Sequence, residues 1–98
     1  MIIVTGSVLA KAEHLEALIA ASLEHVRRSR TEAGCLSHAV HRDEENPLRL
    51  VFFEEWADRA SLAAHFAVPA SRAFVKLAGA FAAEPPAMKV YEATAARP

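Results

Sequence analysis

Residues 48–66 read LRLVFFEEWADRASLAAHF, and this stretch decides how the chain folds. Its first part, Leu48 to Trp56, is apolar on both alternating faces, which is typical of a central strand that is covered on both sides. Asp58 is a good N-cap for a helix over residues 59–67, because its carboxylate accepts hydrogen bonds from free backbone N–H groups. The stretch therefore predicts a strand that passes directly into a short helix.

The flanking segments predict three more strands and two more helices. Residues 2–9 are rich in β-branched side chains and predict the first strand. Residues 35–42 predict a second strand, which forms a hairpin with 48–56 across the polar turn 43–47. A helix begins within residues 11–14 and ends at the glycine stop of residues 31–34, and its apolar stripe is Leu15, Leu18, Ile19, Leu23 and Val26. Val68-Pro69 interrupts the helical pattern before a helix over residues 71–83 and a last strand over residues 87–93.

The order β-α-β-β-α-β, with its second helix split, indicates an α+β protein with the ferredoxin-like arrangement. We expect residues 1–98 to form a single domain with one four-stranded antiparallel sheet and the helices on one face. The other sheet face then needs cover, because the third strand is apolar on both sides. A second copy of the chain, packed sheet to sheet as a homodimer with two-fold symmetry, is the expected partner.

Composition excludes several classes of protein. The formal net charge is −1, so the basic excess typical of nucleic-acid binding is missing. Cys35 is the only cysteine, so the chain can form neither an internal disulfide nor a multi-thiolate metal site. No apolar run approaches the length of a membrane span, about 20 residues, and no signal peptide is recognisable. We therefore expect a soluble cytoplasmic protein.

Several short motifs follow one another in a fixed order. They are Glu32-Ala-Gly-Cys35-Leu, Asp43 with Asn46-Pro47, Phe53-Glu-Glu-Trp56, Leu62-Ala-Ala-His65, Pro69 and Arg72-Ala-Phe74. Together they resemble the antibiotic biosynthesis monooxygenase (ABM) family of small dimeric α+β barrels, over nearly the whole chain. Two positions depart from that family: His38 stands where tyrosine is frequent, and Ala70 stands where a histidine often follows the proline. An imidazole at position 38 can still donate or accept a hydrogen bond.

The ABM family is similar to cofactor-free quinol and polyketide-anthrone oxygenases, and more distantly to haem-degrading oxygenases. The resemblance implies a cofactor-independent monooxygenase that oxidises a small phenolic, quinol or anthrone-type aromatic substrate with O2. A dimeric module that binds a small ligand without turnover is the alternative. A haem-degrading oxygenase is the third possibility, and it needs an axial imidazole such as that of His65.

Cofactor-free oxygenation requires an apolar pocket that desolvates the substrate, takes its proton and stabilises the resulting anion. His65 and His38 are the candidate bases, and we expect them near a pocket between helices and sheet. The expected substrate contacts are Trp56, Phe52, Phe66, Phe74 and Arg72. We expect no cofactor and no metal, because the sequence has neither a ligand-spaced cluster nor a Gly-rich dinucleotide loop.

Each candidate also has a purely structural interpretation. His65 can cap the end of its helix, His38 can be a buried histidine with a partner, and Trp56 can be core or interface packing. Glu54 is expected to be structural rather than a catalytic acid, either in an ion pair with a residue such as Arg72 or Arg49 or in a dimer contact. The remaining histidines are expected to be solvated: His14, His25 and His41. Cys35 is expected to be structural, because no base flanks it in the sequence.

Overall fold

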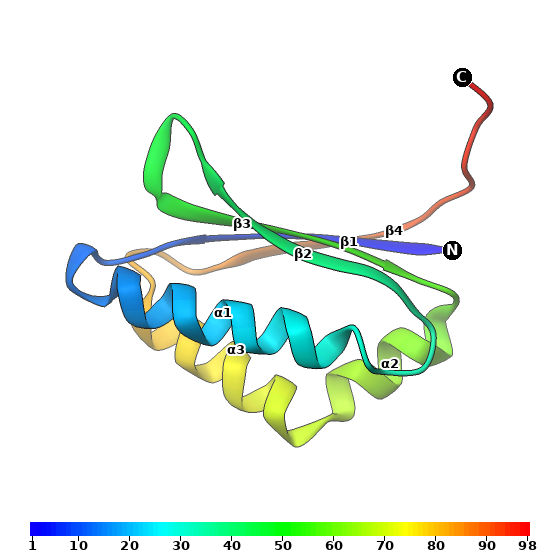
Figure 1. The fold of residues 1–98 in the computed structure, drawn as a ribbon, viewed down its shortest axis with the longest axis horizontal. Coiled ribbons are helices and arrows are strands. Elements are labelled where there is room, and N and C mark those ends of the chain that lie inside the picture. Colours follow the sequence, from blue (N-terminus) through cyan, green and yellow to red (C-terminus); the bar gives the residue numbers. More distant parts are fainter.

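A computed structural model describes residues 1–98 and shows the expected α+β architecture (Figure 1). One antiparallel sheet, in the order β2-β3-β1-β4, contains β1 (Ile2–Leu9), β2 (Cys35–Asp43), β3 (Asn46–Trp56) and β4 (Ala87–Glu92). The helical elements are η1 (Ala12–His14), α1 (Leu15–Ser29), α2 (Arg59–Ala67) and α3 (Pro69–Phe81). The three α-helices all lie against one face of the sheet (Figure 1). The ferredoxin-like fold class is confirmed.

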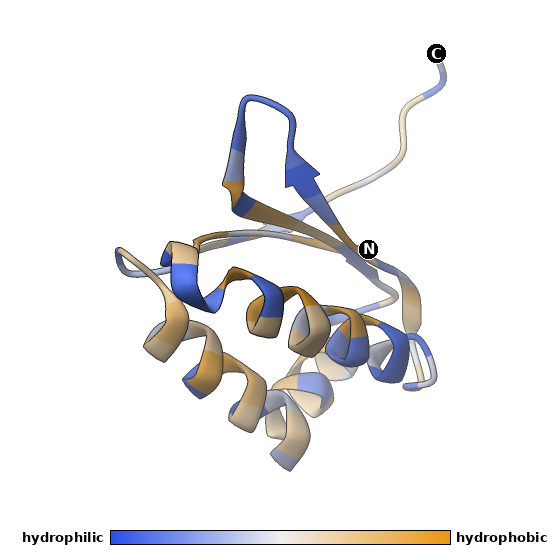
Figure 2. Ribbon diagram, turned by 60° about the vertical axis from the view of Figure 1, so that its left-hand side comes forward, coloured by the Kyte–Doolittle hydropathy of each residue, from blue (hydrophilic) through white to orange (hydrophobic).

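Strand β3 is central and carries the core. It pairs with β1 on one side and β2 on the other, so both of its edges are hydrogen-bonded. Alternation turns Phe52, Glu54 and Trp56 toward the helices, where each is less than a tenth exposed. Figure 2 shows the hydrophilic tip of the β2–β3 hairpin and the more hydrophobic strand segments above the helices. The apolar character of the 48–56 stretch therefore reflects a central position, as expected.

A β-bulge changes the start of β2. Cys35 pairs with Trp56 and Ser37 pairs with Glu55, so Leu36 is the extra residue. The bulge places Cys35 in the cluster of Trp56 and leaves Leu36 58% exposed. Leu36 therefore does not share the buried face of His38, because strict alternation fails at a bulge.

The buried face of α1 includes Leu18 and Val26 of the apolar stripe and extends beyond it. Leu18, Ser22, His25 and Ser29 are all buried and follow one another at spacings of four, three and four residues. Leu23, an expected stripe residue, is 36% exposed. Small and polar side chains therefore continue the buried stripe toward the C-terminal end of α1.

The junction after β3 forms as expected. The Asp58 carboxylate accepts hydrogen bonds from the backbone N–H and the hydroxyl of Ser61, at 2.8 Å each. These bonds lower the pKa of Asp58 and keep the cap charged. Helix α3 begins at Pro69 rather than at Ser71, since proline fits the first helical turn, where its missing N–H has no partner in any case.

The sheet face opposite the helices carries apolar side chains with no cover. Val51, Phe53 and Tyr91 project there and are 37%, 39% and 47% exposed. Every residue of β4 is exposed as well. The helices, which cover the opposite face, are all too short or too polar to cross a membrane.

Gly34 provides the first stability prediction. Its φ is +82°, and a Cβ at this position would collide with the Ser61 side chain of the α2 cap. We expect Gly34→Ala to lower the free energy of unfolding by about 2 kcal/mol or more, because left-handed strain adds to the collision. Urea denaturation measures the change.

Gly79→Ala is the matched control. Gly79 lies inside α3, and a Cβ there meets nothing within 4 Å. The same chemical change should stabilise the protein by about 0.5–1 kcal/mol, because alanine is the better helix former. Equal effects of the two substitutions would contradict this account of Gly34.

Candidate functional site

A cavity of about 640 Å³ lies between the helices and the sheet. Its wall is largely apolar and includes side chains from β1, β3, β4, α2 and α3. Contributors to the apolar part are Val4, Val8, Phe52, Phe66, Phe74, Val75, Ala78 and Met88. Glu54, His25 and His65 also line the wall and make one region of it polar. The cavity can thus accept an aromatic molecule and present titratable groups to it.

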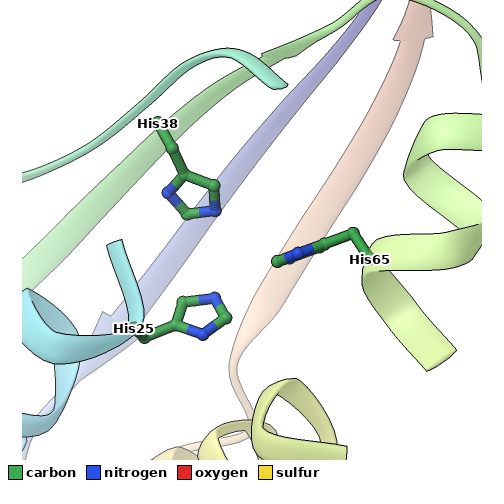
Figure 3. Close-up of side chains that lie close together, drawn as sticks. All are labelled: His25, His38 and His65. Carbon is green, nitrogen blue, oxygen red and sulfur yellow. The ribbon is translucent and has the colours of Figure 1, made fainter. Parts of the chain in front are cut away.

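Three buried imidazoles converge beside this cavity (Figure 3). His25 comes from α1, His38 from β2 and His65 from α2, and the exposed fraction of each is 5%, 1% and 3%. Their ring centroids lie 5.2 to 5.5 Å apart. One nitrogen from each ring lies within 4.8 Å of the others, a separation small enough for side chains that share a ligand.

His65 is supported by a carboxylate. Its Nδ1 lies 2.9 Å from Oε1 of Glu32, in the loop after α1. An ionised carboxylate only accepts hydrogen bonds, so Nδ1 of His65 is the donor. In the neutral imidazole the lone pair then belongs to Nε2, which lies 3.9 Å from Oε1 of Glu54. The pair is therefore arranged as a base whose conjugate acid is stabilised by two nearby carboxylates.

His25 has the opposite hydrogen-bonding character. Arg28 donates to its Nδ1 at 2.8 Å and to Ser71 Oγ at 3.0 Å. Because a guanidinium has no acceptor, Nδ1 of His25 must accept, and its Nε2 carries the proton. Burial above all, and then the neighbouring His38, His65 and Arg28, lower the pKa of His25 from 6.5 to about 3. His25 thus stays neutral near pH 7 and offers an N–H donor.

Glu54 connects the indole to the imidazoles. Its Oε1 accepts a hydrogen bond from Trp56 Nε1 at 2.9 Å and lies 3.2 Å from His38 Nε2. Burial acts to raise the pKa of Glu54, but the contacts with His38, Trp56 and His65 outweigh it, and the net shift is downward. The expected pairing with Arg72 or Arg49 is wrong; Arg49 instead contacts Ser7 and Glu84. Glu54 is therefore an ionised group inside the core.

His38 has no well-aligned hydrogen bond at either ring nitrogen. Its Nε2 lies 3.2 Å from Glu54 Oε1, but the N–H group is not aligned with the oxygen as a hydrogen bond requires. The contact between the two side chains is therefore electrostatic. A buried polar group without a partner costs about 1–3 kcal/mol. The cluster therefore contains a donor or acceptor position that the chain leaves unfilled.

The structure separates the expected site residues into two groups. His65, Phe52, Phe66, Phe74 and Arg72 line the cavity. His38 and Trp56 do not reach the lining: Trp56 is fully buried and packs with Ile2, Val4 and Leu62. His38 contacts the cavity only through Glu54 and lies 5.5 Å, centroid to centroid, from His65.

Sequence reasoning missed His25. It was expected to be solvated, but it is buried and stacks on Phe74 with ring centroids 4.2 Å apart. Its position seven residues after Leu18, two helical turns along the same face, is the signal that indicates burial. His14 is half-buried and stacks on Phe81, also against expectation, whereas His41 is exposed as expected.

Cys35 lies beside the cluster without taking part in it. Burial, and then the carboxylates of Glu32 and Glu54, raise the pKa of its thiol. The thiol therefore stays protonated near neutral pH and is a poor nucleophile. The structural interpretation of Cys35 fits this environment.

The fold and the cavity define a small ferredoxin-like protein with an apolar internal site bordered by imidazoles. Residues 1–77 match the family described as antibiotic biosynthesis monooxygenase, and the chain belongs to that family. The resemblance found in the sequence is confirmed. The matched residues include the junction between β3 and α2, and they also include all three histidines of the cluster.

Known relatives extend the comparison. The uncharacterized protein sll1783 of Synechocystis sp. (strain ATCC 27184 / PCC 6803 / Kazusa) is 35% identical over 93% of this chain, which spans 62% of that protein. A protein of Deinococcus radiodurans, whose crystal structure is provisionally named an antibiotic biosynthesis monooxygenase, is 26% identical in sequence to this chain. The two structures superpose with a TM-score of 0.94 over 100% of this chain and 97% of the other. Protein SO0527 of Shewanella oneidensis is 30% identical in sequence, and its structure superposes with a TM-score of 0.84 over 92% of this chain and 87% of the other.

The low pKa of His25 gives a prediction for stability against pH. Between pH 6.5 and about 3 the unfolded chain binds a proton at His25 that the folded chain does not. Stability is therefore lost as the pH falls through this window. His25→Gln should reduce the loss in unfolding free energy between pH 7 and pH 5 by about 1–2 kcal/mol, as measured by urea denaturation at each pH.

The control is His41→Gln, which changes an exposed histidine of β2. It should leave the pH dependence of unfolding as it is in the unmodified protein. The same slope in both variants would show that His25 is not kept neutral by the fold.

Proposed function

We propose that the protein is a cofactor-independent monooxygenase that oxidises a small phenolic, quinol or anthrone-type aromatic substrate with O2. The main support for this proposal is the Glu32–His65 pair. It places an imidazole that can act as a base at the wall of an apolar cavity of about 640 Å³. Family membership supports the reaction class, since the family is described as monooxygenases. In this proposal the substrate supplies the electrons, so neither flavin nor metal is required for turnover.

Binding and proton transfer come first. The aromatic substrate lies among Phe52, Phe66 and Phe74, which replace its water shell. Its hydroxyl meets His65, whose Nε2 takes the proton while Nδ1 donates to Glu32. The ionised Glu54, 3.9 Å from Nε2, stabilises the imidazolium that results.

The substrate anion then needs a donor, and His25 supplies one. Its Nε2–H, fixed by the Arg28 contact at Nδ1, can donate to the phenolate oxygen without carrying a charge of its own. The electron-rich anion reduces O2. One oxygen atom bonds to a ring carbon and the other leaves as water with two hydrogens from the substrate, so no outside reductant is needed.

His38 and Trp56 act through Glu54 in this scheme. Both lie within 3.2 Å of Glu54 Oε1 and keep the carboxylate ionised. They are positioning residues rather than substrate contacts. Arg72, at the cavity wall and without an ion-pair partner, is placed to attract an anionic substituent of the substrate.

Oxygen uptake with hydroquinones and anthrones tests the proposal. His65→Ala should lower the rate on the order of a hundredfold, and the loss should shrink as the pH rises toward about 10, where phenols ionise unaided. Glu32→Gln should lower the rate about tenfold, because the neutral amide no longer stabilises the imidazolium. His41→Ala should turn over normally.

Two outcomes would decide against imidazole catalysis. Undiminished turnover in the His38→Ala, His65→Ala double variant would leave binding and desolvation as the only contributions. Tight binding of hydroquinones without oxygen uptake would favour the second candidate, a ligand-binding module. The same cavity supports that candidate, because its apolar wall binds an aromatic ring whether or not a proton moves.

We also infer that the protein is a homodimer formed through the open sheet face. Val51, Phe53 and Tyr91 place apolar surface there, and a second copy related by two-fold symmetry would present the same face in return. Two joined sheets would complete a dimeric α+β barrel.

Light scattering at micromolar concentration should give twice the mass of one chain. Phe53→Asp should shift the protein to monomers, because it places a charge in an apolar interface. Val75→Asp is the control: Val75 is 65% exposed on α3, in the helical layer, and should leave the dimer intact. A monomeric unmodified protein would contradict the inference.

A further inference from the structure

The cluster of His25, His38 and His65 contains ring nitrogens that have no hydrogen-bond partner within the chain. His38 is 1% exposed, and neither of its ring nitrogens has an aligned hydrogen-bond partner. In Figure 3 its ring points toward those of His25 and His65. A buried polar ring that points into a cluster without a partner has a nitrogen available to a ligand.

The atoms around these ring nitrogens are suited to a metal ion. Oε1 of Glu54 lies 3.2 Å from Nε2 of His38 and 3.9 Å from Nε2 of His65. Ligand atoms held about 2.1 Å from a tetrahedral ion are separated by about 3.4 Å. We propose that His38, His65 and Glu54 bind a divalent first-row transition ion, with Zn²⁺ as the representative.

His25 is excluded as a ligand although its ring is close. Its Nδ1 accepts from Arg28 at 2.8 Å, so its Nε2 carries a hydrogen and has no lone pair for a metal. The guanidinium would also repel a dication. His25 instead donates to a water molecule or anion bound to the ion. The site is therefore a set of two imidazoles and one carboxylate, not a three-histidine site.

Two of the proposed ligands are already held by hydrogen bonds of the kind that orient metal ligands in known sites. Glu32 accepts from Nδ1 of His65 at 2.9 Å, which directs Nε2 of His65 toward the ion. Trp56 donates to Glu54 at 2.9 Å and fixes the carboxylate. His65 and Glu54 both line the cavity, so an ion can enter from that side. Imidazole ligands favour Zn²⁺, Co²⁺, Ni²⁺ and Cu²⁺ over Mg²⁺ and Ca²⁺.

Metal binding goes beyond the proposed oxygenase activity and would oppose it. The ion would take the Nε2 lone pair of His65 that the proposed reaction uses to accept a proton. If the oxygenase proposal holds, Zn²⁺ should inhibit turnover. The binding proposal does not depend on that activity, so its test uses no substrate.

Titration of the purified, chelator-treated protein with Zn²⁺ by calorimetry, and with Co²⁺ by visible absorption, tests the site. We expect one ion per chain with a micromolar or tighter dissociation constant, and Co²⁺ bands of a low-symmetry site with nitrogen and oxygen ligands. Mg²⁺ should not bind. Absence of Zn²⁺ and Co²⁺ binding at 100-fold excess would overturn the proposal, and so would Mg²⁺ binding as tightly as Zn²⁺.

Variants assign the ligands, with folding checked by circular dichroism. His38→Ala and Glu54→Gln should each weaken Zn²⁺ binding about a hundredfold or more. His25→Gln should weaken it less than tenfold, and the control His41→Ala should leave it unchanged. Equal losses in His25→Gln and His38→Ala would overturn the ligand set, as would unchanged binding in a folded His38→Ala protein. Should Glu54→Gln not fold, Glu54→Asp replaces it, and unchanged affinity in that shortened side chain would count against Glu54.

Discussion

A buried carboxylate organises the polar half of this core. Glu54 is 7% exposed, and a charge at that depth is tolerated only when it is hydrogen-bonded or lies close to groups of complementary charge. Trp56 donates to it, and His38 and His65 lie within 4 Å of it. Without the carboxylate the indole N–H would be buried and unpaired. Glu54 therefore links both imidazoles to the end of β3.

Local geometry explains how a short segment assembles this arrangement. Alternation along β3 puts Glu54 and Trp56 on one face, two residues apart. The charged cap at Asp58 begins α2 immediately, and two turns later His65 lies over the indole, with ring centroids 4.6 Å apart. The segment that determines the fold therefore also supplies Glu54, Trp56 and His65 to the polar cluster.

Sequence patterns predicted the elements well because each has a local cause. The N-cap at Asp58 depends only on residues of its own helical turn, and the glycine stop at Gly34 marks the end of a helix by its own backbone freedom. The imidazole partners of Glu54 could not be predicted in the same way, because they come from β2 and α2 and meet only through strand pairing and helix packing. The bulge at Leu36 and the buried His25 were missed for related reasons: one breaks alternation, and the other continues an apolar stripe with polar residues.

The two imidazoles at the cavity wall illustrate how neighbours assign chemistry to identical rings. His25 faces a guanidinium at 2.8 Å, and His65 faces a carboxylate at 2.9 Å. The first contact forces the ring to offer a proton at Nε2, and the second leaves a lone pair there. A donor and an acceptor thus lie side by side, with ring centroids 5.3 Å apart. In the proposed reaction, that combination suits a substrate hydroxyl, which would give a proton to one ring and then accept a hydrogen bond from the other.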